Sequence, residues 1–166
     1  MENKINYIAE IAQGYEGKFS LAKKLVLAAS KSGANIIKFQ LVNADELSTR
    51  DYEHYNLFKK LRLDEKYWKK IVILSKKKKM KFYFDIFGKE SLNLASKLVV
   101  DGIKIHPTDI GNISLVKKIK NSKIKKIILG IGGAKISEIK KACKVLNNKR
   151  IVLMIGFQSY PTPNDE

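Results

Sequence analysis

Short apolar runs, most of them ending in a single polar residue, recur along this chain. Six of them stand out, at residues 5–11, 35–40, 81–87, 102–106, 125–131 and 150–155. Lys-rich segments with apolar residues at helical spacing lie between them, at about residues 20–33, 64–74, 89–98, 113–120 and 137–146. Buried strands that alternate with amphipathic helices are typical of a parallel α/β sheet. We therefore expect six parallel strands with helices between them.

Several residues mark where these helices begin and end. Ser20 and Asp64 are suitable N-cap residues for the first and second helices. Gly33 lies where a helix C-terminus is expected, because glycine readily adopts the left-handed conformation that ends many helices. The sequence therefore predicts a helix over 20–33 and another that begins at Asp64.

This order of elements is compatible with an open doubly wound sheet or with part of a (β/α)8 TIM-type barrel. A complete barrel usually needs about 250 residues, and the chain has 166. Strand ends are the usual ligand-binding edge in both architectures. We predict a partial barrel that lacks its last two units, formed by residues 1–166 as a single domain.

Composition places the chain among soluble globular proteins, since 45% of its residues are hydrophobic and 30% are charged. No apolar run is long enough to cross a bilayer, and residues 1–4 do not resemble a signal peptide. The single cysteine, Cys143, cannot form an internal disulfide and lies in a predicted helix. We expect a cytoplasmic protein in which Cys143 packs a helix.

The net charge of +17 raises the question of an anionic partner. Most lysines fall on the outer faces of predicted helices, and the chain has only three arginines, Arg50, Arg62 and Arg150. Arginine recognises bases and phosphates better than lysine does. The sequence also does not alternate aromatic and basic residues as a base-stacking surface would. We therefore interpret the charge as a solvated basic surface and expect neither a nucleic acid nor a membrane as a partner.

Two strands carry paired polar residues on one face. Lys38 and Gln40 are two positions apart, as are Lys104 and His106, so each pair projects to the same side of its strand. A lysine within an isoleucine-rich strand is costly unless it has a partner. A lone Lys38 could be a paired structural residue. Together with Lys104 it predicts a site for a small acid with separated negative charges.

Acidic residues end or follow other strands. Glu10 ends the first strand and could act as a general base, orient a sugar hydroxyl or pair with a lysine. Asp85 ends the third strand and has the same alternatives. Asp109 and Asn112 follow the fourth strand, where Asp109 is suited to cap a short helix.

Other local patterns are less informative. The glycines of segment 130–133 let backbone amides approach an anion, but the segment is not a complete dinucleotide-binding motif. No metal-ligand spacing joins His54, His106 and Cys143. His54 is expected to be structural.

Read in order, four segments resemble the catalytic barrel of the N-acetylneuraminate (sialic acid) synthase family. They are residues 8–11 with 16–17, residues 33–40, the segment Lys104–Ile105 with Asp109 and Asn112, and residues 160–163. The resemblance covers nearly the whole chain. The combination of segments is specific, although no single segment is.

The resemblance implies a condensation of phosphoenolpyruvate with an N-acylated amino sugar, typically N-acetylmannosamine, to form a nonulosonic acid. It implies that Lys38 and Lys104 bind phosphoenolpyruvate and that Gln40 and Glu10 line the sugar and the reaction centre. The remaining residues expected to bind substrate are Asp85, Thr108, Asp109, Asn112, Gln158 and Tyr160.

The family also implies a divalent metal, Mn or Mg, and here the chain departs from the pattern. Ile155 occupies the position of the usual sixth-strand histidine ligand, and Gly14 and Tyr15 replace an Asn-His pair. Pro107 replaces a serine, beside Thr108. The second metal histidine and the antifreeze-like domain would follow residue 166, so we expect both to be absent from this chain.

Three functions remain open at this stage. The first is a sialic-acid-type synthase that differs from its relatives in acceptor or metal. The second is a non-catalytic remnant or one subunit of a split barrel, whose open sheet edges would pair with a second copy or with a complementary chain. The third is an aldolase that forms a Schiff base through Lys38 or Lys104.

Overall fold

The computed structural model describes residues 5–156 and 163–164, and the six strands among them form one parallel sheet in the order β1-β2-β3-β4-β5-β6. Each strand pairs with the next strand of the sequence, so the strand order never reverses. A doubly wound sheet does reverse its order at a switch point, which excludes that alternative. The strands are β1 (Ile8–Ala12), β2 (Ile36–Gln40), β3 (Lys81–Ile86), β4 (Gly102–Ile105), β5 (Lys126–Gly130) and β6 (Arg150–Met154).

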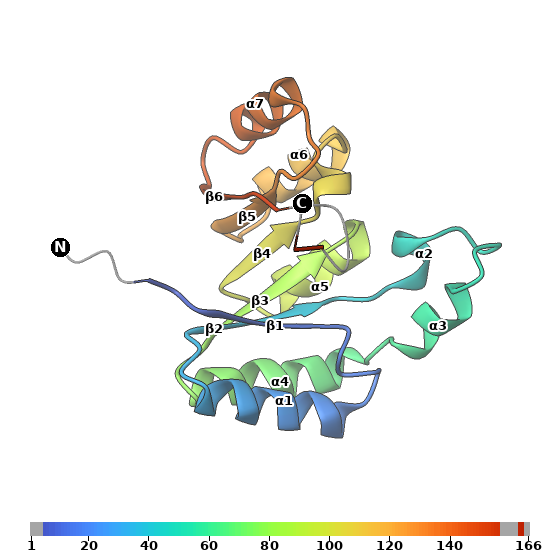
Figure 1. The fold of residues 1–166 in the computed structure, drawn as a ribbon, viewed down its shortest axis with the longest axis vertical. Helices are drawn as coiled ribbons and strands as arrows, with labels where there is room; N and C mark the ends of the chain where they lie inside the picture. Colours follow the sequence, from blue (N-terminus) through green and yellow to red (C-terminus); the bar gives the residue numbers. More distant parts are fainter. Residues whose placement is uncertain (1–4, 157–162, 165–166) are drawn as a thin grey trace.

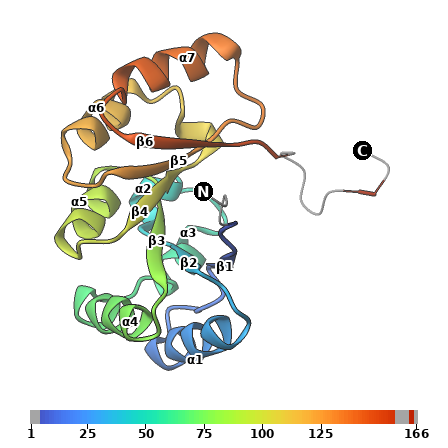
Figure 2. The same cartoon turned by 90° about the vertical axis from the view of Figure 1, so that its left-hand side faces the viewer.

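The helices that link successive strands cover one face of this sheet. Figure 2 shows the strands as an arc with these helices on its outer side. They are α1 (Phe19–Lys31), α4 (Glu65–Lys77), α5 (Lys89–Lys97), α6 (Ile113–Asn121) and α7 (Ile136–Val145). A sheet wound in one direction with its helices outside is part of a (β/α)8 barrel. The predicted partial barrel is therefore confirmed.

Three short elements lie beyond the carboxyl ends of the strands. The connection after β2 holds α2 (Ala44–Leu47) and α3 (Tyr55–Lys60), and the 3-10 helix η1 (Pro107–Asp109) follows β4. Figure 1 shows α2 and α3 extending from the end of β2, away from the helices that cover the sheet. These elements form the rim of the partial barrel.

Side chains alternate between the two faces of the sheet, as the strand period requires. The outer-face residues Phe39, Phe82 and Phe84 are fully buried and join the main core beneath the helices, where Trp68 of α4 contacts Phe84 edge-on at 5.0 Å. On the inner face Ile36, Tyr83 and Ile128 form a separate small cluster with Ile8. This apolar cluster lies on the same face as the polar residues that follow it toward the carboxyl ends of the strands.

Two of the predicted helix ends are confirmed and two are wrong. Asp64 is the N-cap of α4, and Gly33 follows α1 with φ +82°. The helix α1 begins at Phe19 with Lys18 in the N-cap position, so Ser20 is not its cap. Asn112 rather than Asp109 caps α6: the Asn112 side chain accepts a 3.1 Å hydrogen bond from the Leu115 amide, whereas Asp109 lies inside η1.

Among the described residues, none of the helices combines the length and the apolar character needed to cross a bilayer.

Candidate active site at the strand ends

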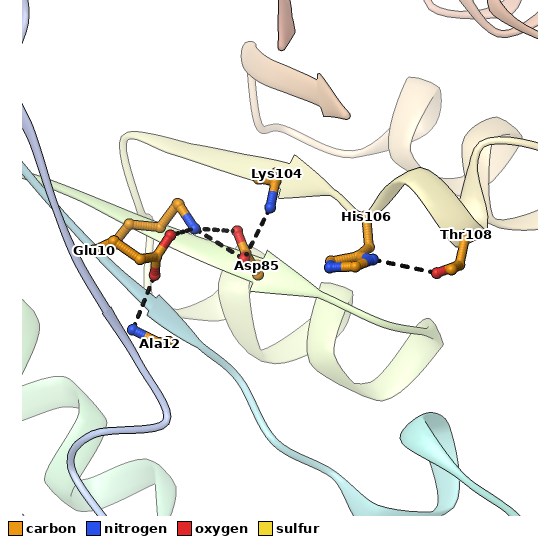
Figure 3. A network of polar contacts seen from close by, with 7 residues as sticks. Glu10, Ala12, Asp85, Lys104, His106 and Thr108 are labelled. Carbon is orange, nitrogen blue, oxygen red and sulfur yellow. Dashed lines mark hydrogen bonds and ion pairs between the residues drawn. The ribbon is translucent and has the colours of Figure 1, made fainter. Parts of the chain in front are cut away.

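Four charged side chains from four successive strands meet on the inner face of the sheet. Glu10 of β1 lies opposite Lys38 of β2, and Asp85 of β3 lies opposite Lys104 of β4 in the strand register. Figure 3 shows Glu10, Asp85 and Lys104 close together, and Lys38 contacts both Glu10 and Asp85. We call these four residues the charged cluster. As predicted from their strand positions, Lys38 and Lys104 lie on the same face of the sheet, where both contact Asp85.

Lys38 is the most enclosed cation of the charged cluster, with 2% of its side chain exposed. Its Nζ lies 2.8 Å from both Asp85 carboxylate oxygens and also pairs with the Glu10 carboxylate. A buried ammonium group needs such partners, because taking an unpaired charge out of water is very costly. Lys38 therefore stabilises the charged cluster through its ion pairs, and it is also a candidate for binding a ligand.

Asp85 joins the two lysines. Its side chain is 1% exposed, and its Oδ2 lies 3.4 Å from the Nζ of Lys104, which is 14% exposed. Sequence reasoning left open whether Asp85 pairs with a lysine, and the structure shows that it contacts both. The two lysines and two carboxylates of the charged cluster cancel in formal charge. Lys104 has a longer contact with Asp85 and a more exposed side chain than Lys38.

A bulge in β1 positions Glu10. The β1–β2 pairing shifts between Glu10 and Ala12, and Ala12 has φ +50°. The Ala12 amide donates a 2.9 Å hydrogen bond to Oε1 of Glu10, while Oε2 pairs with Lys38. The bulge thus holds one carboxylate oxygen and directs the other to the charged cluster. About half of the Glu10 side chain stays exposed and accessible to a ligand.

His106 follows Lys104 on the same face and was not among the predicted site residues. Its Nδ1 lies 3.3 Å from the Thr108 hydroxyl oxygen, and its ring lies 5.9 Å from that of Phe87. Burial lowers the pKa of His106 below 6.5; the positive charge of Lys104, and more weakly that of Lys38, lowers it further, while Asp85 opposes the shift. The spacing of two residues from Lys104 was the sequence signal that could have found it.

The remaining predicted residues occupy different places. Gln40 lies opposite Asp85 in the register, and its backbone carbonyl accepts a 3.2 Å hydrogen bond from the Tyr15 hydroxyl. Thr108 is exposed on η1 beside His106, and Asn112 is occupied as the cap of α6. Gln158 and Tyr160, which were also expected to bind substrate, lie outside the described residues.

Asp109 is half-buried in η1. Burial, and secondarily the negative charge of Glu46, raises the pKa of the Asp109 carboxyl above its ordinary value. Glu46 itself, which sequence reasoning missed, lies on α2 and accepts hydrogen bonds from the backbone amides of Glu90 at 2.6 Å and Ser91 at 3.1 Å. It caps the N-terminus of α5 from 44 residues away. This contact joins α2 of the rim to a helix that covers the sheet.

The described residues do not form a metal centre. No three His, Cys, Asp or Glu side chains among residues 5–156 and 163–164 gather closely enough to hold a metal ion. Ile155, which the resemblance aligns with a histidine ligand, has an apolar side chain that is 83% exposed. A Mn or Mg ion stays a prediction from the resemblance, and no step below depends on one.

Two concave regions that could be mistaken for the site lie away from the charged cluster. One, of about 350 Å³, lies between the connection after β2 and α5, where Asn43, Arg62 and Glu90 line it. Another, of about 430 Å³, lies at the opposite end of the inner face, beside Tyr83 and Lys126. We assign the candidate site to the charged cluster because titratable groups of opposite sign meet there at the strand ends, which is where barrels bind their ligands.

Known proteins resemble this chain in sequence and in fold. Residues 25–166 match the model of the NeuB family. The N,N'-diacetyllegionaminic acid synthase of Campylobacter jejuni is 33% identical over 96% of this chain and 53% of its own length. The N-acetylneuraminic acid (sialic acid) synthetase of Leptospira borgpetersenii, solved in complex with citrate, superimposes with a TM-score of 0.91 at 30% identity, over 98% of this chain and 57% of that one.

A more distant structure supports the architecture alone. The phospho-2-dehydro-3-deoxyheptonate aldolase of Thermotoga maritima is 16% identical with a TM-score of 0.72, over 95% of this chain and 44% of its own. The fold thus defines the class of the protein as a (β/α) barrel.

The chain belongs to the NeuB family, whose named relatives here make sialic and legionaminic acids. It spans about half the length of the curated relatives it matches. Membership of this family connects the chain with carbohydrate biosynthesis.

Proposed function

We propose that this protein condenses phosphoenolpyruvate with an N-acylated amino sugar to form a nonulosonic acid. The observation that carries the proposal is the convergence of the Lys38 and Lys104 ammonium groups on one carboxylate at the strand ends. Two cations held within reach of a single carboxylate group can equally hold the charges of a small acid. The family relationship supports the same chemistry.

Within this proposal, Lys104 is the group that turns from Asp85 to the incoming acid. Its 3.4 Å contact with Asp85 is longer than the 2.8 Å contacts of Lys38, and its side chain is the more exposed. Lys38 stays paired and supplies a fixed positive potential. The half-exposed Glu10 carboxylate is placed to accept a hydrogen bond from a hydroxyl of the sugar, which would orient the aldehyde toward the enol carbon.

Substitution of Lys104 tests the proposal. Lys104→Met keeps the length and apolar stem of the side chain but removes its charge, and we expect it to weaken phosphoenolpyruvate binding by about tenfold or more, as the loss of one charge-assisted hydrogen bond predicts. Lys97→Met is the matched control, because Lys97 pairs with Glu65 on the outer helices.

Titration calorimetry measures the binding, and phosphate release in the presence of N-acetylmannosamine or other amino sugars measures the reaction. If the protein neither binds phosphoenolpyruvate nor releases phosphate with any sugar of a panel, the proposal is wrong. Unchanged binding by Lys104→Met would remove this lysine from the site.

A further inference from the structure

The geometry points to His106 as a further catalytic residue, which takes a proton from the attacking water and gives it to the departing phosphate. This inference rests on the proposed function and adds a group to it. The sequence resemblance assigns no role to position 106. The argument depends on where the imidazole lies, what holds it and which charges face it.

His106 lies next to the candidate anion site. It follows Lys104 by two residues, so the two side chains leave the same face of the chain about 7 Å apart along the strand direction. Figure 3 shows both side chains on the same side of β4. A three-carbon acid that contacts the Lys104 ammonium group can therefore extend to the imidazole.

The ring is held by its neighbours. Thr108 on η1 lies 3.3 Å from Nδ1, and the Phe87 ring lies on another side at 5.9 Å. When the Thr108 hydroxyl oxygen accepts a hydrogen bond from Nδ1–H, Nε2 carries the lone pair that a base needs. The hydroxyl can thus support the tautomer that the proposed step uses.

The charges around His106 favour the neutral ring before substrate binds. Lys104 on its own strand and Lys38 on β2 face it with positive charge, and Asp85 on β3 is the opposing negative charge. A doubly charged phosphate bound beside Lys104 would raise the proton affinity of the ring. The neutral ring can then accept the proton of the attacking water, and the nearby phosphate stabilises the imidazolium that forms until the proton is returned.

The proposed step balances as follows. After the enol carbon bonds to the aldehyde carbon and solvent protonates the aldehyde oxygen, a water oxygen bonds to the next carbon of the acid and one water proton moves to Nε2 of His106. The bond between that carbon and the phosphate oxygen then breaks, and His106 returns its proton to the departing phosphate. The second water proton leaves for solvent as the carbonyl forms, so no oxidant or reductant is needed.

Proton magnetic resonance tests the inference without turnover, because the chain has only two histidines. We expect phosphoenolpyruvate to move the titration midpoint of the His106 ring to higher pH. The His54 signal is an internal control and should not respond, since that ring is exposed on the rim beside Tyr52. A phosphoenolpyruvate complex in which the His106 titration is unchanged would overturn the inference.

Kinetics supply the second readout. His106→Asn should lower kcat about 10²-fold or more, leave phosphoenolpyruvate affinity within about threefold and remove the acidic limb of the pH–rate profile. His54→Asn should change none of these. If His106→Asn does not fold, Thr108→Val tests the same role, because it removes only the ring's hydrogen-bond partner and should lower kcat with little change in KM.

The outcomes separate the two proposals. Absence of phosphoenolpyruvate binding to the unaltered protein would overturn the proposed function together with this step. Normal turnover and an unchanged pH profile in His106→Asn would overturn the role of His106 alone.

Discussion

Lys38 and Asp85 lie on neighbouring strands, with the Lys38 ammonium nitrogen 2.8 Å from both carboxylate oxygens of Asp85. Both side chains are almost fully enclosed, and Lys104 shares the same carboxylate. Asp85 is thus the counter-charge of two lysines. Its removal should affect both stability and ligand binding.

Asp85→Asn should lower the free energy of unfolding by about 3–5 kcal/mol, since it leaves buried ammonium groups with less compensation. Denaturant unfolding measures the change. Asp51→Asn, at an exposed position on the rim, should stay within about 0.5 kcal/mol of the unaltered protein. A loss below 1 kcal/mol in Asp85→Asn would show that Glu10 alone suffices to balance Lys38.

The carboxyl group of Asp109 predicts a pH dependence of stability. Its pKa is raised above the ordinary 3.8, so the folded chain binds its proton more tightly than the unfolded chain does. Below that pH both forms are protonated and the group has no effect. As the pH rises toward the folded pKa the group costs stability, and the cost persists at neutral pH.

Asp109→Asn should therefore raise the melting temperature at pH 7, and the gain should shrink as the pH falls below about 4. Scanning calorimetry across pH 3–8 tests this. Glu53→Gln, an exposed carboxyl on the rim, is the control. A gain that is the same at every pH would assign the effect to packing rather than to ionisation.

Glu46 predicts a local weakening of the rim. Glu46→Ala removes the acceptor of the Glu90 and Ser91 amides and should cost about 0.5–2 kcal/mol, as the loss of a helix cap does. Hydrogen exchange of these two amides should accelerate more than that of amides in α6. Glu46→Gln keeps one acceptor and should recover part of the loss; equal effects of both substitutions would exclude a capping role.

Two glycines with similar backbone angles give a matched pair. Gly17 and Gly33 have φ +67° and +82°, so alanine is strained at both positions. A Cβ on Gly17 would lie 2.2 Å from the Lys60 carbonyl oxygen, whereas a Cβ on Gly33 would meet nothing within 4 Å.

Gly33→Ala should therefore cost about 1 kcal/mol from the backbone alone, and Gly17→Ala should cost at least about 1 kcal/mol more, because the chain after α3 must move. Thermal unfolding of the two variants measures the difference. Equal losses would show that the loop after β1 relaxes freely.

Strand and helix positions were predictable because apolar runs and helical spacing are local properties of the chain. The side of the strand that Lys38 and Lys104 share was predictable for the same reason, since alternation has a period of two. The position of Asp85 between them was not, because it requires the strand order. The sequence pattern is the same for a barrel and for a doubly wound sheet, and only the pairing of the strands distinguishes the two.

Other features depend on contacts between distant parts of the sequence. Glu46 caps a helix that begins 43 residues later, and nothing local to Glu46 indicates that partner. The β1 bulge that orients Glu10 depends on how β1 pairs with β2. Asn112 rather than Asp109 is the N-cap of α6, because Asp109 is part of the 3-10 helix η1, which ends before α6 begins.

The alternation of side chains along β2, β3 and β4 has an evolutionary consequence. Residues that pack against the helices and residues that carry the charges are neighbours in sequence, yet they lie on opposite faces of the same strand. The charged groups can therefore change without altering the residues that pack the helices, provided that the buried charges stay balanced. Divergent chemistries can arise within such a family without any loss of its shape.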